Sequence, residues 1–77
     1  MREIMLSKLD LLTPARVAGI NCNSSDGRRF LDLGIINGAT VRPLFRSPLG
    51  DPTAYEICKS IIALREEDAE RIIVTEI

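Results

Sequence analysis

Turn-forming residues interrupt this sequence so often that each apolar segment between them is short. Pro14, the pair Asn37 and Gly38, and the segment 47–52, which holds two prolines and one glycine, separate segments rich in β-branched residues. Short apolar segments at this spacing are typical of an all-β domain. The predicted strands are residues 15–22, 40–46, 53–60, 61–64 and 72–77.

A sheet of short strands has two exposed edges, and closure into a small barrel hides them. The length of 77 residues fits one small domain, so we expect a single domain over residues 1–77. We predict about five strands with one or two short helices. An α+β sandwich is the alternative architecture.

The first helix is expected over residues 28–33. The four polar residues at 23–26 are N-cap candidates, because their side chains can accept hydrogen bonds from the first helical amides. Gly34 stands where a helix favours a left-handed C-terminal residue. Ile35 or Ile36 is then expected to fold back onto the helix.

The spacing within this helix assigns its faces. Phe30 and Leu33 lie three residues apart and share one apolar face, whereas Arg28 and Arg29 fall mostly on the solvent side. We therefore expect Leu33 to pack in the core and Gly34 to cap the helix. A second, solvated helical turn is expected over residues 65–71.

Several residues predict local irregularities in the strands. Gly19 indicates a bulge or a close backbone contact, and Pro43 indicates an edge or a bulge because it lacks an amide hydrogen. Alternation places Tyr55, Ile57 and Ile61 on one face. A tight turn is expected near residues 59–60.

The charge pattern bears on partners. The net charge is −1, which argues against nucleic-acid binding, since that needs excess lysine and arginine. Residues 24–50 carry four basic and two acidic side chains, whereas residues 51–77 carry three basic and seven acidic ones.

The apolar segments bear on localisation. No apolar run is long enough to cross a membrane, and charged residues interrupt the N-terminal segment, which is not typical of a secretory signal. We therefore expect a cytoplasmic protein without membrane insertion.

The sequence offers little reactive chemistry. It contains no histidine, and its two cysteines, Cys22 and Cys58, have no context that activates a thiol. Zinc sites favour closely spaced ligand pairs, and no CxxC or HxxxH pair is present. We expect no enzyme and no resident cofactor, while a ferrous iron or zinc site shared between two copies stays open.

The 47–52 loop is the main candidate for a binding element. Its prolines and glycine restrict the backbone, and Leu49 stands at the expected tip. A rigid loop that presents an apolar side chain loses little entropy on docking. The alternative is that Leu49 folds back onto the end of the barrel.

The order of these motifs closely resembles the FeoA (ferrous iron transport protein A) family. The resemblance extends from about Leu9 to Val74, with Phe30 at a position that is usually leucine-like and Cys58 at one where the family often has a small residue such as glycine. The matching residues are Arg28 to Ile35, Gly38, Val41, Ser47 to Pro52, Tyr55 to Ile57, Ala63 to Arg65, Ala69, Ile73 and Val74.

The resemblance implies an SH3-like β-barrel, similar to the C-terminal domain of iron-dependent regulators of the diphtheria toxin repressor type. It also implies a cytoplasmic accessory protein of bacterial ferrous iron uptake. The implied partner is FeoB, a membrane permease with a cytoplasmic GTP-binding domain.

We predict one partner-binding surface and keep two alternatives. The first alternative is a metal-responsive module that dimerises, so that a homodimer stays open, and the second is a small nucleic-acid-binding barrel. The predicted partner-binding residues are Arg28, Arg29, Pro48, Leu49, Gly50, Asp51 and Tyr55.

Overall fold

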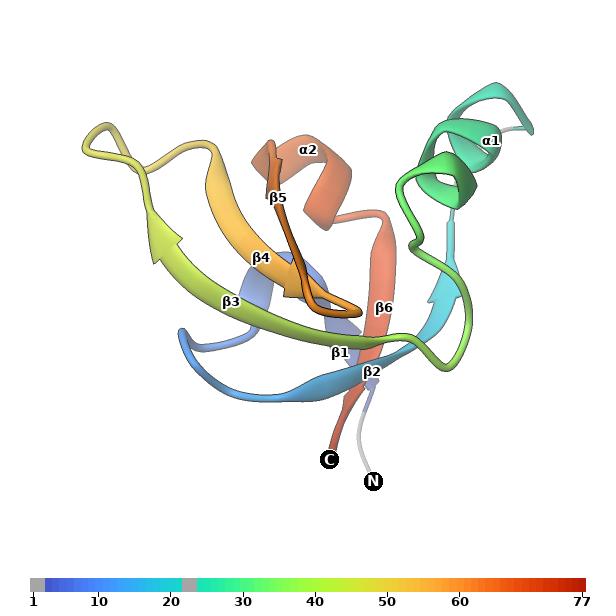
Figure 1. Ribbon diagram of the computed structural model, residues 1–77, viewed down its shortest axis with the longest axis horizontal. Helices are drawn as coiled ribbons and strands as arrows, with labels where there is room; N and C mark the ends of the chain where they lie inside the picture. Colours follow the sequence, from blue (N-terminus) through green and yellow to red (C-terminus); the bar gives the residue numbers. More distant parts are fainter. Residues whose placement is uncertain (1–2, 22–23) are drawn as a thin grey trace.

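The computed structural model describes residues 3–21 and 24–77. Within these residues the chain forms one six-stranded sheet with two short α-helices and one 3-10 helix (Figure 1). The elements are β1 (Glu3–Met5), η1 (Leu6–Lys8), β2 (Ala15–Ile20), α1 (Ser24–Asp32), β3 (Thr40–Arg46), β4 (Thr53–Ile57), β5 (Ser60–Leu64), α2 (Glu66–Ala69) and β6 (Ile72–Glu76).

All strand pairs are antiparallel, and the order across the sheet is β1-β6-β2-β3-β4-β5. The all-β prediction is confirmed, but the chain has one strand more than the five expected. The additional strand is β1, a three-residue strand that pairs with β6. Its few residues carry too little alternation to be recognised before the pairing with β6 is known.

Two bulges bend the sheet at the positions that Gly19 and Pro43 predict. The β2–β6 register shifts between Val17 and Gly19, and the β3–β4 register shifts between Pro43 and Phe45. A bulge places one extra residue in a strand and increases its local twist. The bends let a small sheet curve around its own core, as Figure 1 shows.

Helix α1 begins at Ser24, four residues before the predicted start, and ends at Asp32, one residue before the predicted end. Its C-terminal glycine cap is the predicted one. Gly34 has a φ of 85°, the Gly34 amide donates to the Leu31 carbonyl at 2.9 Å, and the Ile35 amide donates to the Phe30 carbonyl at 2.9 Å. This is the Schellman arrangement, in which the residue after the glycine packs back onto the helix. Ile35 is accordingly buried.

One expected core residue of α1 lies elsewhere. Leu33 is 36% exposed, so its assignment to the core is wrong, and Ile36 is exposed as well. The reason is that α1 ends at Asp32, and the capping turn directs Phe30 and Ile35 inward instead. Of the four N-cap candidates, Asn23 lies outside the described residues, as does Cys22. Residues 24–26 already belong to α1, so their prediction as N-cap residues is wrong.

The β4–β5 connection also differs by one residue from the prediction. Cys58 and Lys59 form the turn, with φ values of 50° and 73°, and Ser60 already belongs to β5. Ile57 is buried as predicted, but Ile61 is 67% exposed, so its predicted place on the core face is wrong. The two-residue turn shifts the alternation, so that Ile62 rather than Ile61 follows Tyr55 and Ile57 on the inner face.

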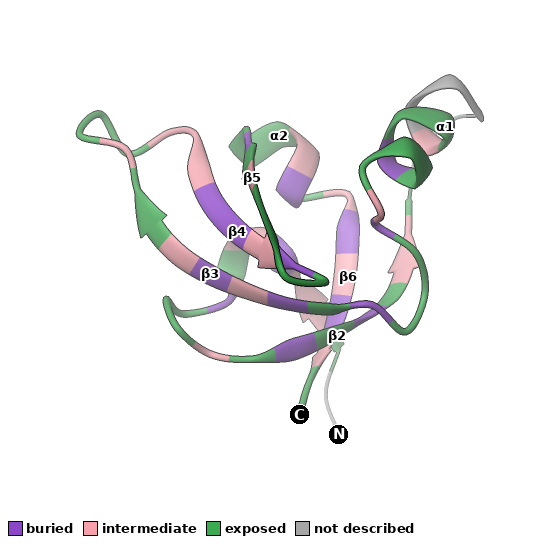
Figure 2. Cartoon of the chain, in the orientation of Figure 1, coloured by how far each residue is buried: buried purple, intermediate pink, exposed green. Residues whose placement is uncertain are grey.

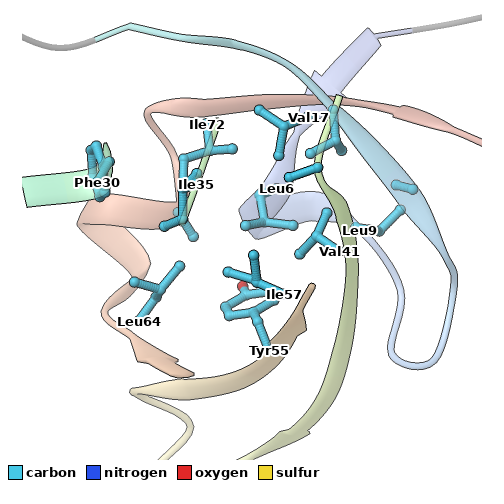
Figure 3. Packing of buried hydrophobic residues seen from close by; sticks show 14 residues of the cluster. Leu6, Leu9, Val17, Phe30, Ile35, Val41, Tyr55, Ile57, Leu64 and Ile72 are labelled. Atoms are coloured by element: carbon cyan, nitrogen blue, oxygen red, sulfur yellow. The ribbon is translucent and has the colours of Figure 1, made fainter. Parts of the chain in front are cut away.

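The core lies on the concave side of the curved sheet. Figure 3 shows Phe30, Ile35, Leu64 and Ile72 at one end of the cluster. The buried cluster consists of Leu6, Leu9, Ala15, Val17, Phe30, Ile35, Ala39, Val41, Tyr55, Ile57, Leu64, Ala69, Ile72 and Val74. Nearly every element contributes to it, so the fold is stabilised chiefly by apolar burial.

Candidate functional site

The β3–β4 connection forms a closed, projecting loop (Figure 1). The Ser47 amide donates to the Pro52 carbonyl at 3.0 Å, and the Gly50 amide donates to the Ser47 carbonyl at 2.8 Å. Gly50 has a φ of 89°, which a residue with a Cβ rarely adopts. The loop therefore has a defined shape of its own and does not need the body of the protein to hold its tip.

Leu49 lies at the tip of this loop and is 95% exposed. The alternative in which Leu49 folds back onto the barrel is therefore wrong. Pro48 and Gly50 on either side are exposed too. An almost completely hydrated leucine on an ordered loop has no role in the core, which leaves it free to contact another molecule.

Phe45 extends the apolar character of this end of the molecule. It lies in β3 just before the loop and is 58% exposed. The sequence prediction overlooked it because the bulge at Pro43 shifts the alternation of β3 after that residue. The proline in the strand was the available signal, since a bulge there reverses which of the following side chains point outward.

Asp51 fixes the base of the loop to helix α2. Its Oδ1 atom accepts a hydrogen bond from the Glu66 amide at 2.8 Å, and its Oδ2 atom lies 3.6 Å from the Arg65 guanidinium. A carboxylate that accepts from a first-turn amide caps a helix and complements its positive end. Asp51 thus positions the loop through α2, while the tip stays unencumbered.

Tyr55, a predicted surface residue, belongs to the core instead. It is only 4% exposed, and Figure 3 shows it beside Ile57. Burial raises the pKa of its hydroxyl, and a hydrogen bond with Thr53 partly offsets this. The side chain lies on the inner face of β4, so little of its surface is available to a partner.

A small groove lies beneath the loop. Its lining includes the charged residues Arg46 and Glu66 and the loop residue Gly50. The groove is narrow, so it accommodates a small polar group at most. The other residues around it are Ser7, Leu9, Leu11, Pro43, Thr53 and Tyr55.

Arg28 and Arg29 lie far from the loop. Both belong to α1, which stands at the opposite end of the long axis in Figure 1. Arg29 forms a bidentate pair with Asp68 of α2, at 2.8 and 3.1 Å, and its guanidinium stacks over the Phe30 ring at 5.0 Å. The structure therefore divides the predicted partner surface into two regions.

The ion pair between α1 and α2 favours the ionised form of the Asp68 carboxyl. The hydrogen bonds from Arg29 lower the pKa of the Asp68 carboxyl, with further lowering by the charges of Arg29 and Arg71. The Asp68 side chain is 13% exposed, whereas that of Arg29 is 47% exposed. Arg29 therefore acts in holding α1 against α2.

The described residues do not form a metal site. Residues 3–21 and 24–77 bring together no group of three histidine, cysteine, aspartate or glutamate side chains. Cys58 is exposed on the β4–β5 turn, and Cys22 lies outside the described residues. This donor set does not fit a resident zinc or iron ion, since zinc sites in proteins usually use four ligands.

Comparison with protein families decides the family. The FeoA domain model matches residues 4–76. The chain belongs to the FeoA family. This family is associated with ferrous iron transport, and its domain is of an accessory or regulatory type.

Solved structures of FeoA proteins agree with the fold. The FeoA protein of Chlorobium tepidum is 31% identical with a TM-score of 0.88, covering 96% of this chain and 70% of the other. A zinc complex of FeoA from Stenotrophomonas maltophilia, an SH3 domain protein, is 32% identical with a TM-score of 0.78, covering 91% and 87%. The expected SH3-like fold is confirmed.

A more distant structure shares the fold alone. A manganese-dependent transcriptional repressor is 21% identical with a TM-score of 0.87, covering 97% of this FeoA chain and 42% of the repressor.

A search of curated protein sequences found no match. Among the described residues, no helix is long and apolar enough to cross a membrane.

Proposed function

We propose that this FeoA-family chain is a cytoplasmic accessory protein of bacterial ferrous iron uptake that binds and regulates the FeoB permease. The tip of the β3–β4 loop makes the contact. The observation that carries the proposal is the 95% exposure of Leu49 on a hydrogen-bonded loop. Family membership and the ferrous iron transport activating role suggested for the S. maltophilia relative support it.

The binding surface consists of an anchor and its support. Leu49 inserts into an apolar site of the partner, with Pro48 and Gly50 holding its backbone and Phe45 adding apolar area. Burial of a leucine side chain contributes roughly 1.5–3 kcal/mol. Because the loop is already ordered, little of that gain is lost to ordering it on binding.

Replacement of Leu49 tests this surface. Purified Leu49→Asp is expected to lose at least about tenfold in affinity for the purified cytoplasmic region of FeoB, since it places a charge in an apolar contact. Calorimetry or surface plasmon resonance measures the affinity. The thermal midpoint is expected to stay unchanged, because Leu49 makes no core contact.

Leu31→Asp is the matched control. Leu31 is an exposed leucine of α1, at the other end of the molecule, and its replacement is expected to leave FeoB binding intact. Binding by Leu49→Asp that equals wild type would exclude the loop as the contact. Loss of binding in Leu31→Asp alone would move the contact to α1.

The alternative of a metal-responsive, dimerising module has narrower support. A relative 32% identical to this chain forms a zinc complex. The described donor groups of this chain are too dispersed to reproduce a site within one copy. We therefore favour the interaction module.

A further inference from the structure

Strand β5 leaves one edge of the sheet open. It is the last strand in the sheet order and pairs with β4 alone. Among the described residues, no loop or turn forms a backbone hydrogen bond with residues 60–64. The edge of β5 opposite β4 is therefore unpaired within the described part of the chain.

The turn geometry identifies which backbone groups face this edge. Cys58 and Lys59 both have positive φ values, as in a type I′ turn, so Ile57 and Ser60 share both hydrogen bonds of the closing pair. Hydrogen-bonded and non-hydrogen-bonded pairs then alternate along β4 and β5. The amide and carbonyl groups of Ile61 and Ala63 consequently point away from β4.

Strand β5 lacks most of the features that protect an edge strand from pairing. The five residues Ser60–Leu64 include no proline and no charged side chain. The β4–β5 register runs without a bulge, whereas both the β2–β6 and β3–β4 registers shift. Figure 2 shows most of β5 as exposed, so solvent reaches the strand.

Charges at the two ends of β5 select what can pair with it. Lys59 precedes the strand and Arg65 follows it. In an antiparallel pair of two β5 strands, Ile61 of each copy would lie opposite Ala63 of the other. This register would place Lys59 opposite Arg65 of the other copy. Like charges that oppose each other across strands are destabilising, so this edge disfavours its own copy.

The same two cations attract acidic groups. Arg65 lies 3.6 Å from Asp51, but both side chains are substantially exposed, so the ion pair holds Arg65 only weakly. We propose that β5 binds an extended segment of another protein by strand addition, a segment with apolar residues in its centre and an acidic residue at each end. Main-chain hydrogen bonds to Ile61 and Ala63 would supply the affinity, and the end charges the selectivity.

A model peptide tests this proposal. The probe is a short peptide of alternating valine and threonine with an aspartate at each end, and its control has lysine at each end. Titration followed by amide NMR is expected to shift the Ile61 and Ala63 amides and slow their hydrogen exchange. The Ile62 amide, which already bonds to β4, serves as the internal reference.

Two variants separate backbone pairing from charge. Ala63→Pro removes an outward amide and is expected to reduce affinity about tenfold, whereas Ala63→Ser keeps the amide and the affinity. Lys59→Glu is expected to weaken binding of the aspartate-ended peptide, and it leaves the outward amide and carbonyl groups of β5 unchanged. Leu49→Asp is expected to change nothing here, so failure of the loop proposal and of this one are distinguishable.

Three results would overturn the proposal. One is the absence of shifts at millimolar aspartate-ended peptide in folded wild-type protein. Another is equal binding of the aspartate-ended and lysine-ended peptides. The third is a concentration-dependent dimer in sedimentation that Lys59→Glu strengthens, because a second copy would then be the occupant.

Discussion

The two ends of the long axis use their prominent apolar residues in opposite ways. At the α1 end, Phe30 is completely buried and anchors the helix to the core. At the loop end, Leu49 is almost completely exposed and contributes nothing to the core. The comparison indicates that core packing stabilises the α1 end, whereas the tip of the loop, where we propose the partner contact, adds nothing to the core.

Both ends nevertheless connect to the same short helix, α2. Asp51 joins the loop to the first turn of α2, and Asp68 joins α2 to Arg29 of α1. The elements that carry these contacts are short, so polar side chains supply links that a larger domain obtains from packing. Each link can be tested separately, and the expected effects differ in size.

The largest effect is expected at the apolar anchor of α1. Phe30→Ala is expected to lower the free energy of unfolding by about 3–5 kcal/mol, because it removes a fully buried ring and leaves a cavity. Leu49→Ala is expected to change the free energy of unfolding by less than about 0.5 kcal/mol. Urea denaturation of the two variants measures both values.

The milder variant Phe30→Leu covers the case in which Phe30→Ala does not fold. It is expected to cost about 1–2 kcal/mol, since it keeps part of the buried apolar volume but leaves a small cavity. Equal destabilisation by Leu49→Ala and Phe30→Leu would contradict the assignment of the two ends.

A smaller effect is expected at the ion pair between α1 and α2. Asp68→Asn is expected to lower the free energy of unfolding by about 1 kcal/mol at neutral pH, because charged hydrogen bonds to Arg29 are lost. The pKa of Asp68 is below its ordinary value of 3.8 in the folded protein. The ionised carboxylate therefore stabilises the fold above that value, and this contribution is lost as the pH falls through the folded-state pKa.

The measurement is the unfolding free energy of wild type and Asp68→Asn as the pH is lowered. The difference between them is expected to stay constant above about pH 5 and to disappear in strong acid. Glu67→Gln, at the exposed neighbouring position, is the matched control and is expected to change the free energy of unfolding by less than about 0.5 kcal/mol at neutral pH. A constant difference between wild type and Asp68→Asn down to strong acid would contradict the role of this charge.

The smallest of the three effects is expected at the base of the loop. Asp51→Ala is expected to lower the free energy of unfolding by about 1 kcal/mol or less, because the Glu66 amide loses its acceptor. Asp51→Asn keeps an acceptor oxygen, so it is expected to lower the free energy of unfolding by only a few tenths of a kcal/mol. Faster hydrogen exchange of the Glu66 amide in Asp51→Ala alone would locate the change, and unchanged exchange in both variants would contradict the cap.

Local signals in the sequence predicted the elements well. Gly34 specified the cap at the end of α1, Gly19 and Pro43 marked the two bulges, and the 47–52 segment specified the projecting loop. These features depend on backbone dihedral preferences and on alternation within a few residues. Such preferences act over short stretches of chain, so the sequence alone displays them.

The tertiary structure decided which residues meet. It placed Arg28 and Arg29 far from the loop, buried Tyr55 under it, and paired Arg29 with Asp68, which lies 39 residues further along the chain. It also left β5 at an open edge. These outcomes depend on strand order and on the two bulges that curve the sheet, and a register shift of one residue exchanges the inner and outer faces of a strand. The sequence therefore determined the parts of this protein, and the long-range pairing of its strands determined the surface that those parts present.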